Sequence, residues 1–279
     1  MDPISRLERA KSLDRWTAAG QRVARLLPPG RARDVLHGVW LGHPLHPVLV
    51  QVPVGTWLSA SLLDTWPGNE KAARRLVLAG LAASVPAALA GAADWSEQHE
   101  QQMRVGAVHA LVAVTAMACY AASAAAPARA AKGLRLAGLA IASAGGFLGG
   151  HVAYRQSAGA SQAEPVPHLV EPGWHDLMPA ADLAALADGQ PARRMLGEVP
   201  VVVVRDGSRV HVLADRCSHL SGPLSDGDYA GGCLACPWHG SAFRVADGSV
   251  ARGPATAPQP VFQTRVTAGA LQACLPGAG

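Results

Sequence analysis

The sequence predicts two domains of different class: an N-terminal all-α bundle of four transmembrane helices and a C-terminal all-β domain. Long apolar runs occupy the first half of the 279-residue chain, and short strand-like runs separated by Asp-Gly and Gly-Pro turns occupy the second half. The composition agrees with a part-membrane chain. Hydrophobic residues make up 49% of it and charged residues only 16%, against about a quarter in soluble domains.

Composition divides the chain into four segments. They are a basic N-terminal tail (1–37), a membrane domain (38–155), a linker (156–167) and the β domain (168–279). The arginines of the tail predict contact with anionic lipid head groups, and the tail has no apolar run that would make it a cleavable signal peptide. Aromatic residues are not interleaved with the basic ones as base stacking requires, so we do not expect a nucleic-acid partner.

Four apolar runs predict the membrane helices, and they cover residues 48–66, 76–93, 105–126 and 136–154. Each run is long enough to cross a hydrocarbon core of about 30 Å at about 1.5 Å per residue. Core helices of a soluble bundle are the alternative, but four runs joined by short charged connectors favour the membrane. Connectors this short predict an up-and-down bundle of antiparallel neighbours.

The histidines of this half lie at the ends of runs that share one side of the membrane. The first and third runs begin on that side and the second and fourth end there, so His46, His109 and His151 should gather at one face. Histidines inside membrane segments are costly and often functional. The hypotheses are a haem b held by His109 with His46 or His151, a metal or quinone site, or histidines that only bond helix ends.

Four short motifs carry a family resemblance in this half: GHPLHPVLVQVPVG, GAADW, VGAVHALV and GGHVAYR. They resemble a bacterial four-span membrane domain family, marked by GHPLHP, that has no established function. The resemblance covers roughly residues 38–156. It implies the four-span topology and supplies no activity.

The second half places three of the five cysteines of the chain in one stretch, DRCSHLSGPLSDGDYAGGCLACPWHGSAF. Two of these cysteines are followed by histidines, in Cys217-Ser-His219 and Cys236-Pro-Trp-His239. Two thiolates and two imidazoles can hold a tetrahedral zinc ion, or a [2Fe–2S] cluster in which two histidines replace two cysteines on one iron. Zinc ribbons use cysteine pairs two to four residues apart, so the Cys-x-His arrangement fits zinc poorly.

The pattern CSH, CPWHGS and Gly-Pro-Ala at residues 253–255 resembles the Rieske [2Fe–2S] family over roughly residues 168–275. The resemblance implies that Cys217 and Cys236 hold a buried iron and that His219 and His239 hold an outer one. It also implies that the Ser241 hydroxyl bonds toward a cluster sulfur.

Two departures from respiratory Rieske subunits narrow the resemblance. Those subunits join their two loops by a disulfide, whereas Ser221 and Trp238 stand in these places here. The chain is therefore more similar to Rieske-type ferredoxins, with a potential toward the low end of about −150 to +300 mV. Terminal oxygenases carry a further domain with a 2-His-1-carboxylate iron, but the 40 residues after His239 contain no histidine, so we do not expect a terminal oxygenase.

We therefore expect a membrane-anchored component that passes single electrons between a redox partner and the membrane domain or another partner. The partner would be a reductase, an oxygenase or a respiratory component. A cluster-based redox sensor and a haem- or quinone-linked membrane oxidoreductase are the alternatives. We expect a multi-pass protein of the cell membrane with the Rieske domain in the cytoplasm, because no twin-arginine signal for folded export precedes the first or last apolar run.

Overall fold

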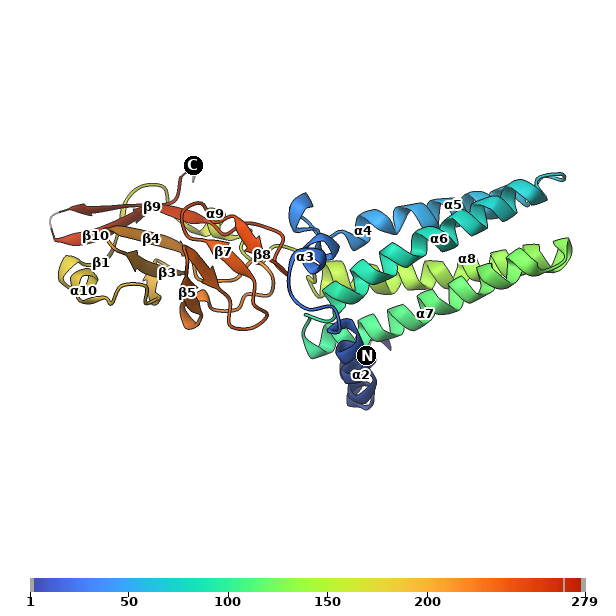
Figure 1. The fold of residues 1–279 in the computed structure, drawn as a ribbon, viewed down its shortest axis with the longest axis horizontal. Helices are drawn as coiled ribbons and strands as arrows, with labels where there is room; N and C mark the ends of the chain where they lie inside the picture. The colour runs from blue at the N-terminus through green and yellow to red at the C-terminus, as the bar shows by residue number, and fades with distance from the viewer. Residues whose placement is uncertain (1–2, 268, 277–279) are drawn as a thin grey trace. The chain divides into compact units, whose positions relative to one another are not determined.

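The computed structural model describes residues 3–267 and 269–276 and divides the chain into two compact units. The helical unit comprises Met1–Pro28 and Pro44–Ala158, and the β unit comprises Pro29–His43 and Gly159–Gly279 (Figure 1). The division differs from the segments drawn by composition, because residues 29–43 lie with the C-terminal unit. The chain therefore passes between the two units three times.

The helical unit is built from long helices that run along one another (Figure 1). Its elements are α1 (Pro3–Glu8), η1 (Lys11–Leu13), α2 (Asp14–Ala24), α4 (His46–Leu49), α5 (Gln51–Leu63), α6 (Glu70–Trp95), α7 (Glu100–Ala125), α8 (Ala128–Gly150) and the π-turn η3 (His151–Arg155). Three helical stretches are long and apolar enough to cross a membrane: Glu70–Trp95, Glu100–Ala125 and Ala128–Arg155. These three correspond to the second, third and fourth apolar runs of the sequence.

The first apolar run forms two shorter helices, so four membrane-spanning helices are not shown. The helix breaks at Val50, between α4 and α5. Pro53 explains the break, because it has no N–H to donate to the carbonyl of Leu49 and is tolerated in the first turn of a new helix. Three of the four expected spans therefore form helices long and apolar enough to cross a membrane, and the first stays a prediction.

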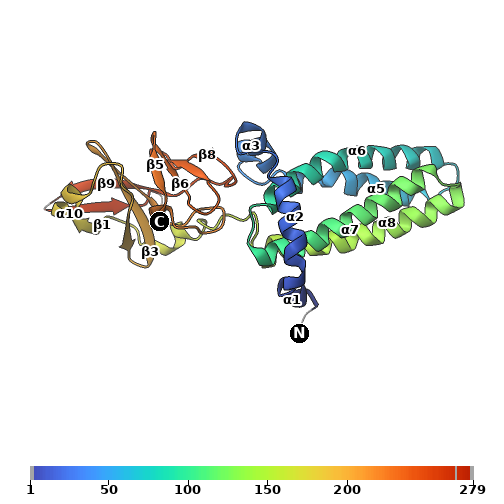
Figure 2. The same ribbon diagram turned by 60° about the horizontal axis from the view of Figure 1, so that its bottom comes forward.

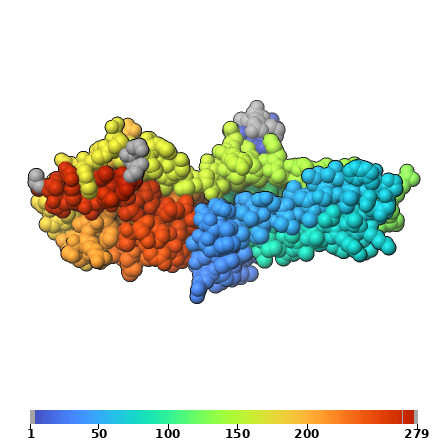
Figure 3. Space-filling model, turned by 90° about the horizontal axis from the view of Figure 1, so that it is seen from above, coloured from blue at the N-terminus to red at the C-terminus, as the bar shows by residue number. Residues whose placement is uncertain are grey.

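The outer surface of the helical unit is apolar. Figure 3 shows the face formed by α5 and α6, drawn in light blue and cyan. Large side chains of α5 and α6 that are about half exposed include Val52, Leu58, Leu62, Leu78 and Leu89. Exposed apolar surface this extensive marks a membrane or protein contact.

Buried arginines tie the helices together at both ends of the unit. Arg135 of α8 donates from Nε and Nη2 to the carboxylate of Asp64, at 2.6 and 2.5 Å. At the other end, Arg104 of α7 is bonded to Asp14, to Glu100 and to the carbonyl of Glu8. Because of these bonds the basic tail is folded, and α2 runs across the end of the bundle (Figure 2). The Arg104 hydrogen bond also holds the pKa of Asp14 below its usual value.

The β unit contains two antiparallel sheets. In the described residues one sheet has the order β1-β10-β9-β4-β3-β2 and the other β5-β6-β7-β8. The strands are β1 (His175–Pro179), β2 (Ala192–Leu196), β3 (Val199–Asp206), β4 (Arg209–Ala214), β5 (Asp228–Ala230), β6 (Cys233–Ala235), β7 (Ala242–Arg244), β8 (Val250–Arg252), β9 (Val261–Thr267) and β10 (Ala270–Cys274). Short helical elements are α3 (Arg31–His37), η2 (Val39–Leu41), α9 (Val166–Leu169), α10 (Ala180–Ala185) and η4 (Leu224–Asp226).

Strand β3 is buried on both faces and separates two apolar cores. Val201 and Val203 face one core, while Val202 and Val204 face the other, which also contains Cys217. Side chains of a strand alternate between its faces, so a strand with a core on each side is apolar throughout. This arrangement explains the unbroken run of valines, and it places the second core directly under the cysteine loops.

Segment 29–43 packs against the Gly-Pro-Ala loop of the β unit. Asp34 of α3 accepts a hydrogen bond from the buried N–H of Gly253, with its Oδ1 at 2.9 Å. A Cβ built on Gly253 would lie only 3.2 Å from atoms of Asp34, His37 and Val39, so a larger residue there would push against this segment. The predicted linker is also partly packed, because the N–H of Gln162 donates to the carbonyl of Ser218 at 2.8 Å.

Candidate functional site

Two loops of the β unit carry the predicted ligands, and their backbones are built alike. The first loop follows β4 and contains Cys217; the second joins β6 to β7 and contains Cys236. In each loop the cysteine N–H donates to the carbonyl five residues later, and the N–H four residues later donates back to the cysteine carbonyl. The bonds are Cys217 to Gly222 at 2.9 Å, Ser221 to Cys217 at 2.8 Å, Cys236 to Ser241 at 2.8 Å and Gly240 to Cys236 at 3.1 Å. The two halves of the site are therefore near copies of each other.

Each loop also contains one left-handed residue, four positions after its cysteine. Gly240 has a φ of 76° and Ser221 a φ of 63°. Glycine adopts this conformation freely, whereas a residue with a Cβ does so at a cost of about 1–2 kcal/mol. The first loop therefore carries backbone strain that the second loop avoids.

The two thiols lie at the bottom of the site, in contact with each other. Cys217 and Cys236 are 1% and 4% exposed, and neither forms a disulfide. The backbone N–H groups two and three positions after each cysteine are directed at its sulfur. The hydrogen bond between the thiols, together with burial, raises the pKa of Cys217, and the same bond lowers the pKa of Cys236 to about 7. Of the two thiols, Cys236 is therefore the one that loses its proton first.

The two imidazoles lie next to each other and are more exposed to solvent than the thiols. The rings of His219 and His239 have their centroids 5.1 Å apart and are perpendicular. Both side chains are half-buried, in contrast to the fully buried cysteines. Among the residues that the structure describes, no three His, Cys, Asp or Glu side chains converge on one point. A pair of thiols beside a pair of imidazoles fits a cluster with two protein ligands per iron better than a four-ligand zinc ion.

Ser241 is the last residue of the second loop and is fully buried. Its hydroxyl oxygen accepts the N–H of Ala255 in the Gly-Pro-Ala loop at 2.9 Å. The hydroxyl proton is not used by this bond, so it can be donated to a further acceptor. The role of Ser241 toward a cluster sulfur stays a prediction.

Trp238 packs across the two loops at the position where a disulfide is absent. A Cβ built on Gly222 would lie 3.1 Å from the Trp238 indole and 2.7 Å from the Cys236 sulfur. Glycine at position 222 therefore lets the second loop approach the first. Trp238 is also 50% exposed, so its ring joins the loops on one side and faces outward on the other.

Sequence reasoning missed the groups that fix the first loop. Asp215 is buried and accepts the N–H and hydroxyl of Ser225 at 2.6 and 2.8 Å, and burial raises its pKa. Gln259 donates to the carbonyls of Ala214 and Arg216 at 3.1 and 2.8 Å. Only the position of Asp215, next to the ligand motif, could have indicated its role. Gln259 is far along the chain and has no local signal.

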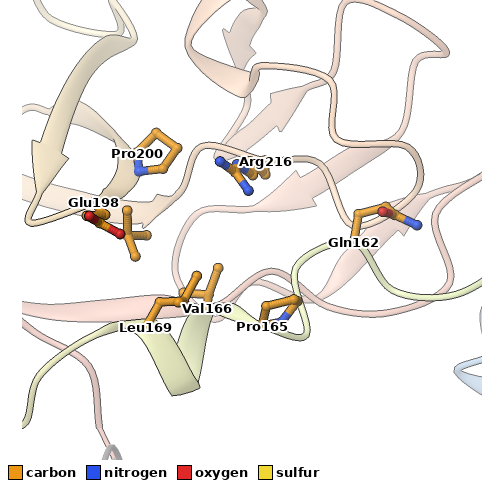
Figure 4. A pocket seen from close by; sticks show the side chains of 8 residues that line it. Gln162, Pro165, Val166, Leu169, Glu198, Pro200 and Arg216 are labelled. Carbon is orange, nitrogen blue, oxygen red and sulfur yellow. The ribbon is translucent and has the colours of Figure 1, made fainter. Parts of the chain in front are cut away.

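A small cavity lies behind the first loop, between α9 and the start of β3 (Figure 4). Its volume is about 20 Å³, and its lining includes Pro165, Val166, Leu169, Pro200 and Arg216. A volume of this size holds about one water molecule. It has no room for an organic substrate.

The structure brings two of the three membrane-domain histidines together. His46 and His109 have ring centroids 6.3 Å apart. His151 instead places its Nε2 2.9 Å from the carboxylate of Glu8. His46 and His109 are therefore neighbours, whereas the hydrogen bond given for His151 is to Glu8.

Residues 173–263 match the Rieske [2Fe-2S] domain family. Ferredoxin CarAc of Metapseudomonas resinovorans is 37% identical over 91 residues, which are 31% of this chain and 85% of the relative. The ferredoxin subunit of anthranilate 1,2-dioxygenase from Burkholderia cepacia is 30% identical over 99 residues, 36% of this chain and 89% of the relative. A solved complex of reduced oxygenase and oxidized ferredoxin in carbazole 1,9a-dioxygenase contains a chain that is 32% identical, with 36% of this chain and 92% of that chain covered and a TM-score of 0.33.

The matched region contains both cysteine loops and leaves out the helical unit, so it gives no support to haem b. A Rieske domain implies a [2Fe–2S] cluster. The ferredoxin relatives are covered almost from end to end at 30% identity or more. Through residues 173–263 the chain belongs to the Rieske [2Fe–2S] family.

Proposed function

We propose that the protein is a membrane-anchored electron-transfer component in which Cys217 and Cys236 hold one iron of a [2Fe–2S] cluster and His219 and His239 hold the other. One observation carries the proposal. Two buried, paired thiols occupy matched positions of two loops built alike, and each loop adds one of two half-exposed, adjacent imidazoles. Zinc would require all four groups on one ion, whereas a cluster needs them as two pairs.

The protein groups have separate tasks in this proposal. The bound cluster supplies reversible one-electron chemistry. Backbone N–H groups of the two loops donate to the cysteine sulfurs and stabilise their negative charge. The imidazoles of His219 and His239 connect the buried site to the surface, where a second protein can approach. Trp238, exposed beside His239, offers that protein an aromatic contact.

The partner is inferred from the relatives. Of the two relatives named above, one is named as a ferredoxin and the other as the ferredoxin subunit of a dioxygenase. An electron-transfer partner of this chain would accordingly be a reductase or an oxygenase, with a respiratory component as the further candidate.

The membrane anchor is the second part of the proposal. Three long apolar helices and the outward-facing leucines and valines of the helical unit support it. The β unit is placed in the cytoplasm, because a cluster inserted there needs no transport of a folded domain. Protease treatment of spheroplasts tests this side: protection of the β unit until lysis is expected, and digestion in intact spheroplasts would contradict the cytoplasmic side.

The cluster is tested on the full-length protein purified in detergent. We expect two irons and two acid-labile sulfides per chain, a visible absorption that bleaches with dithionite, and a paramagnetic signal in the reduced state. His239→Ala should abolish all of these, whereas the matched control His211→Ala, a half-buried histidine of β4 outside the loops, should keep them. A colourless protein that carries zinc, or a His239→Ala variant with the cluster intact, would overturn the proposal.

A further inference from the structure

The helical unit contains an internal repeat with approximate two-fold symmetry. His46 and Trp57 lie on α4 and α5, and His109 and Tyr120 lie on α7; the members of both pairs, His46/His109 and Trp57/Tyr120, are 63 residues apart. Trp57 stacks on Tyr120, with ring centroids 4.3 Å apart and planes within 15°. The two histidines are also neighbours, at 6.3 Å. Equivalent residues therefore meet each other at two levels of the bundle.

The partner helices α6 and α8 repeat in the same way, with a spacing of 58 residues. A Cβ on Gly80 would collide with Trp57 at 2.4 Å, and a Cβ on Gly138 would lie 2.9 Å from Tyr120. Further along the bundle, a Cβ on Gly91 would lie 2.7 Å from the His46 ring, and a Cβ on Gly149 would lie 3.2 Å from the His109 ring. Each of the four rings thus packs on a glycine, and these glycines occupy equivalent positions in the two repeats. The repeat unit is a helical hairpin, and the symmetry axis passes between the two histidines.

Both histidines use the same nitrogen for the same kind of bond. Nδ1 of His46 lies 2.8 Å from the carbonyl of Ala87, and Nδ1 of His109 lies 2.8 Å from the carbonyl of Gly145. Each carbonyl lies four residues before the glycine on which the ring rests. A carbonyl only accepts hydrogen bonds, so both Nδ1 atoms carry the proton and both Nε2 atoms carry a lone pair. Metal-ligating histidines are held in this way, by an Nδ1–H bond to a carbonyl or carboxylate.

We infer that His46 and His109 together bind a metal centre through their Nε2 atoms, at the symmetry axis of the helical unit. The 6.3 Å between the ring centroids is roughly the sum of two metal–nitrogen bonds of about 2.0–2.1 Å and the half-widths of two imidazoles. A quinol between the rings would need two hydrogen bonds of about 2.7–2.8 Å in addition to its own width, which exceeds this distance. His151 takes no part, since its Nε2 is bonded to Glu8.

The number of ligands limits the metal. Within the described part of the chain, no third His, Cys, Asp or Glu side chain joins this pair. Zinc requires three or four protein ligands and is therefore a poor fit. Two imidazoles are enough for the iron of a haem, whose porphyrin supplies the remaining nitrogens, or for a two-coordinate cuprous ion. Both satisfy the same chemistry, a metal held between two imidazoles.

The test measures metals in the full-length protein purified in detergent, together with its reduced-minus-oxidised visible spectrum. We expect one haem or one copper per chain in addition to the two irons of the cluster, as isolated or after addition of hemin or of cuprous ion with ascorbate. His46→Gln and His109→Gln should each weaken binding at least about tenfold. Gly91→Ala should weaken it as well, by displacing the His46 ring. His151→Gln is the matched control and should bind normally.

The outcomes separate this inference from the proposed function. Retention of the reduced-cluster signal in His46→Gln and His109→Gln shows that the β unit of these variants is folded and that its cluster is not affected, and an unchanged helical circular-dichroism signal shows the same of the helical unit. Sharp haem bands and a bound copper ion distinguish the two sources of the metal. The inference is overturned if the wild type binds neither hemin nor cuprous ion, or if both glutamine variants bind as tightly as the wild type. Loss of the cluster in His239→Ala with the second centre intact would support the independence of the two sites.

Discussion

Substitution of Ser241 by alanine tests how the protein sets the potential of the cluster. The Ser241 hydroxyl is fully buried, accepts the N–H of Ala255 at 2.9 Å and has its proton left to donate. A hydrogen bond to a charged acceptor contributes about 1.5–3 kcal/mol. The reduced cluster carries one more negative charge than the oxidised one, so the bond favours reduction. If about 1–2 kcal/mol of it depends on the redox state, its loss lowers the potential by roughly 40–85 mV, at about 59 mV per tenfold change for one electron.

The same substitution has a second effect that does not depend on the cluster. Ala255 is buried, and without the hydroxyl its N–H has no acceptor, which costs about 1–3 kcal/mol of stability. Ser218→Ala is the matched control, because the buried Ser218 hydroxyl donates to the carbonyl of Ala257 at 2.7 Å and has no second proton to offer. The control should lose stability and keep its potential.

The assay is a redox titration of the reduced-cluster signal in the detergent-purified full-length protein, with thermal loss of the visible absorption as the measure of stability. The expected result is a lowered potential in Ser241→Ala alone and lowered stability in both variants. The reasoning is refuted if Ser241→Ala titrates within roughly 20 mV of the wild type, or if Ser218→Ala lowers the potential as much.

Three further variants test individual features of the two units. Gly240→Ala should lose about 1–2 kcal/mol of stability, because residue 240 has a positive φ, although the added Cβ has space. The counterpart Ser221→Gly should not be destabilised. Thermal loss of the cluster absorption compares the stability of the two variants. Asp64→Asn should destabilise the helical unit by about 3–5 kcal/mol by leaving a buried arginine of α8 unpaired, which thermal unfolding in detergent would show; an unchanged midpoint would contradict the buried ion pair. Asp34→Ala should cost about 1–3 kcal/mol and speed trypsin cleavage around α3, and equal cleavage rates would contradict the docking of that helix.

The cluster loops could be predicted because their information is local. Cys217 and His219 lie within one loop, as do Cys236 and His239, so the spacing of the residues already fixes which groups can meet. Strand-like runs and turn residues on both sides then indicate the class of domain. The helical hairpins were predictable for the same reason, since each apolar run is continuous in the sequence.

Contacts between distant residues could not be predicted. Asp34 and Gly253 are 219 positions apart, and Glu8 and His151 are 143 apart. Nothing in the residues around Asp34 indicates that its carboxylate accepts a backbone N–H of a loop at the other end of the chain. The break before α5 is different, because Pro53 is visible in the sequence; hydrophobicity alone outweighed its effect on helix hydrogen bonding.

The position of residues 29–43 in the β unit constrains how the chain can pass through a bilayer. This segment precedes α5 to α8, and the rest of its unit follows them, yet both parts form one compact body. Two parts of one folded body lie on the same side of a membrane, so in the anchored protein that we propose, the chain between them crosses an even number of times. The three long helices alone give an odd number. The 18 residues from His46 to Leu63, which include α4 and α5 and would span about 27 Å at about 1.5 Å per residue, would supply the crossing that parity requires.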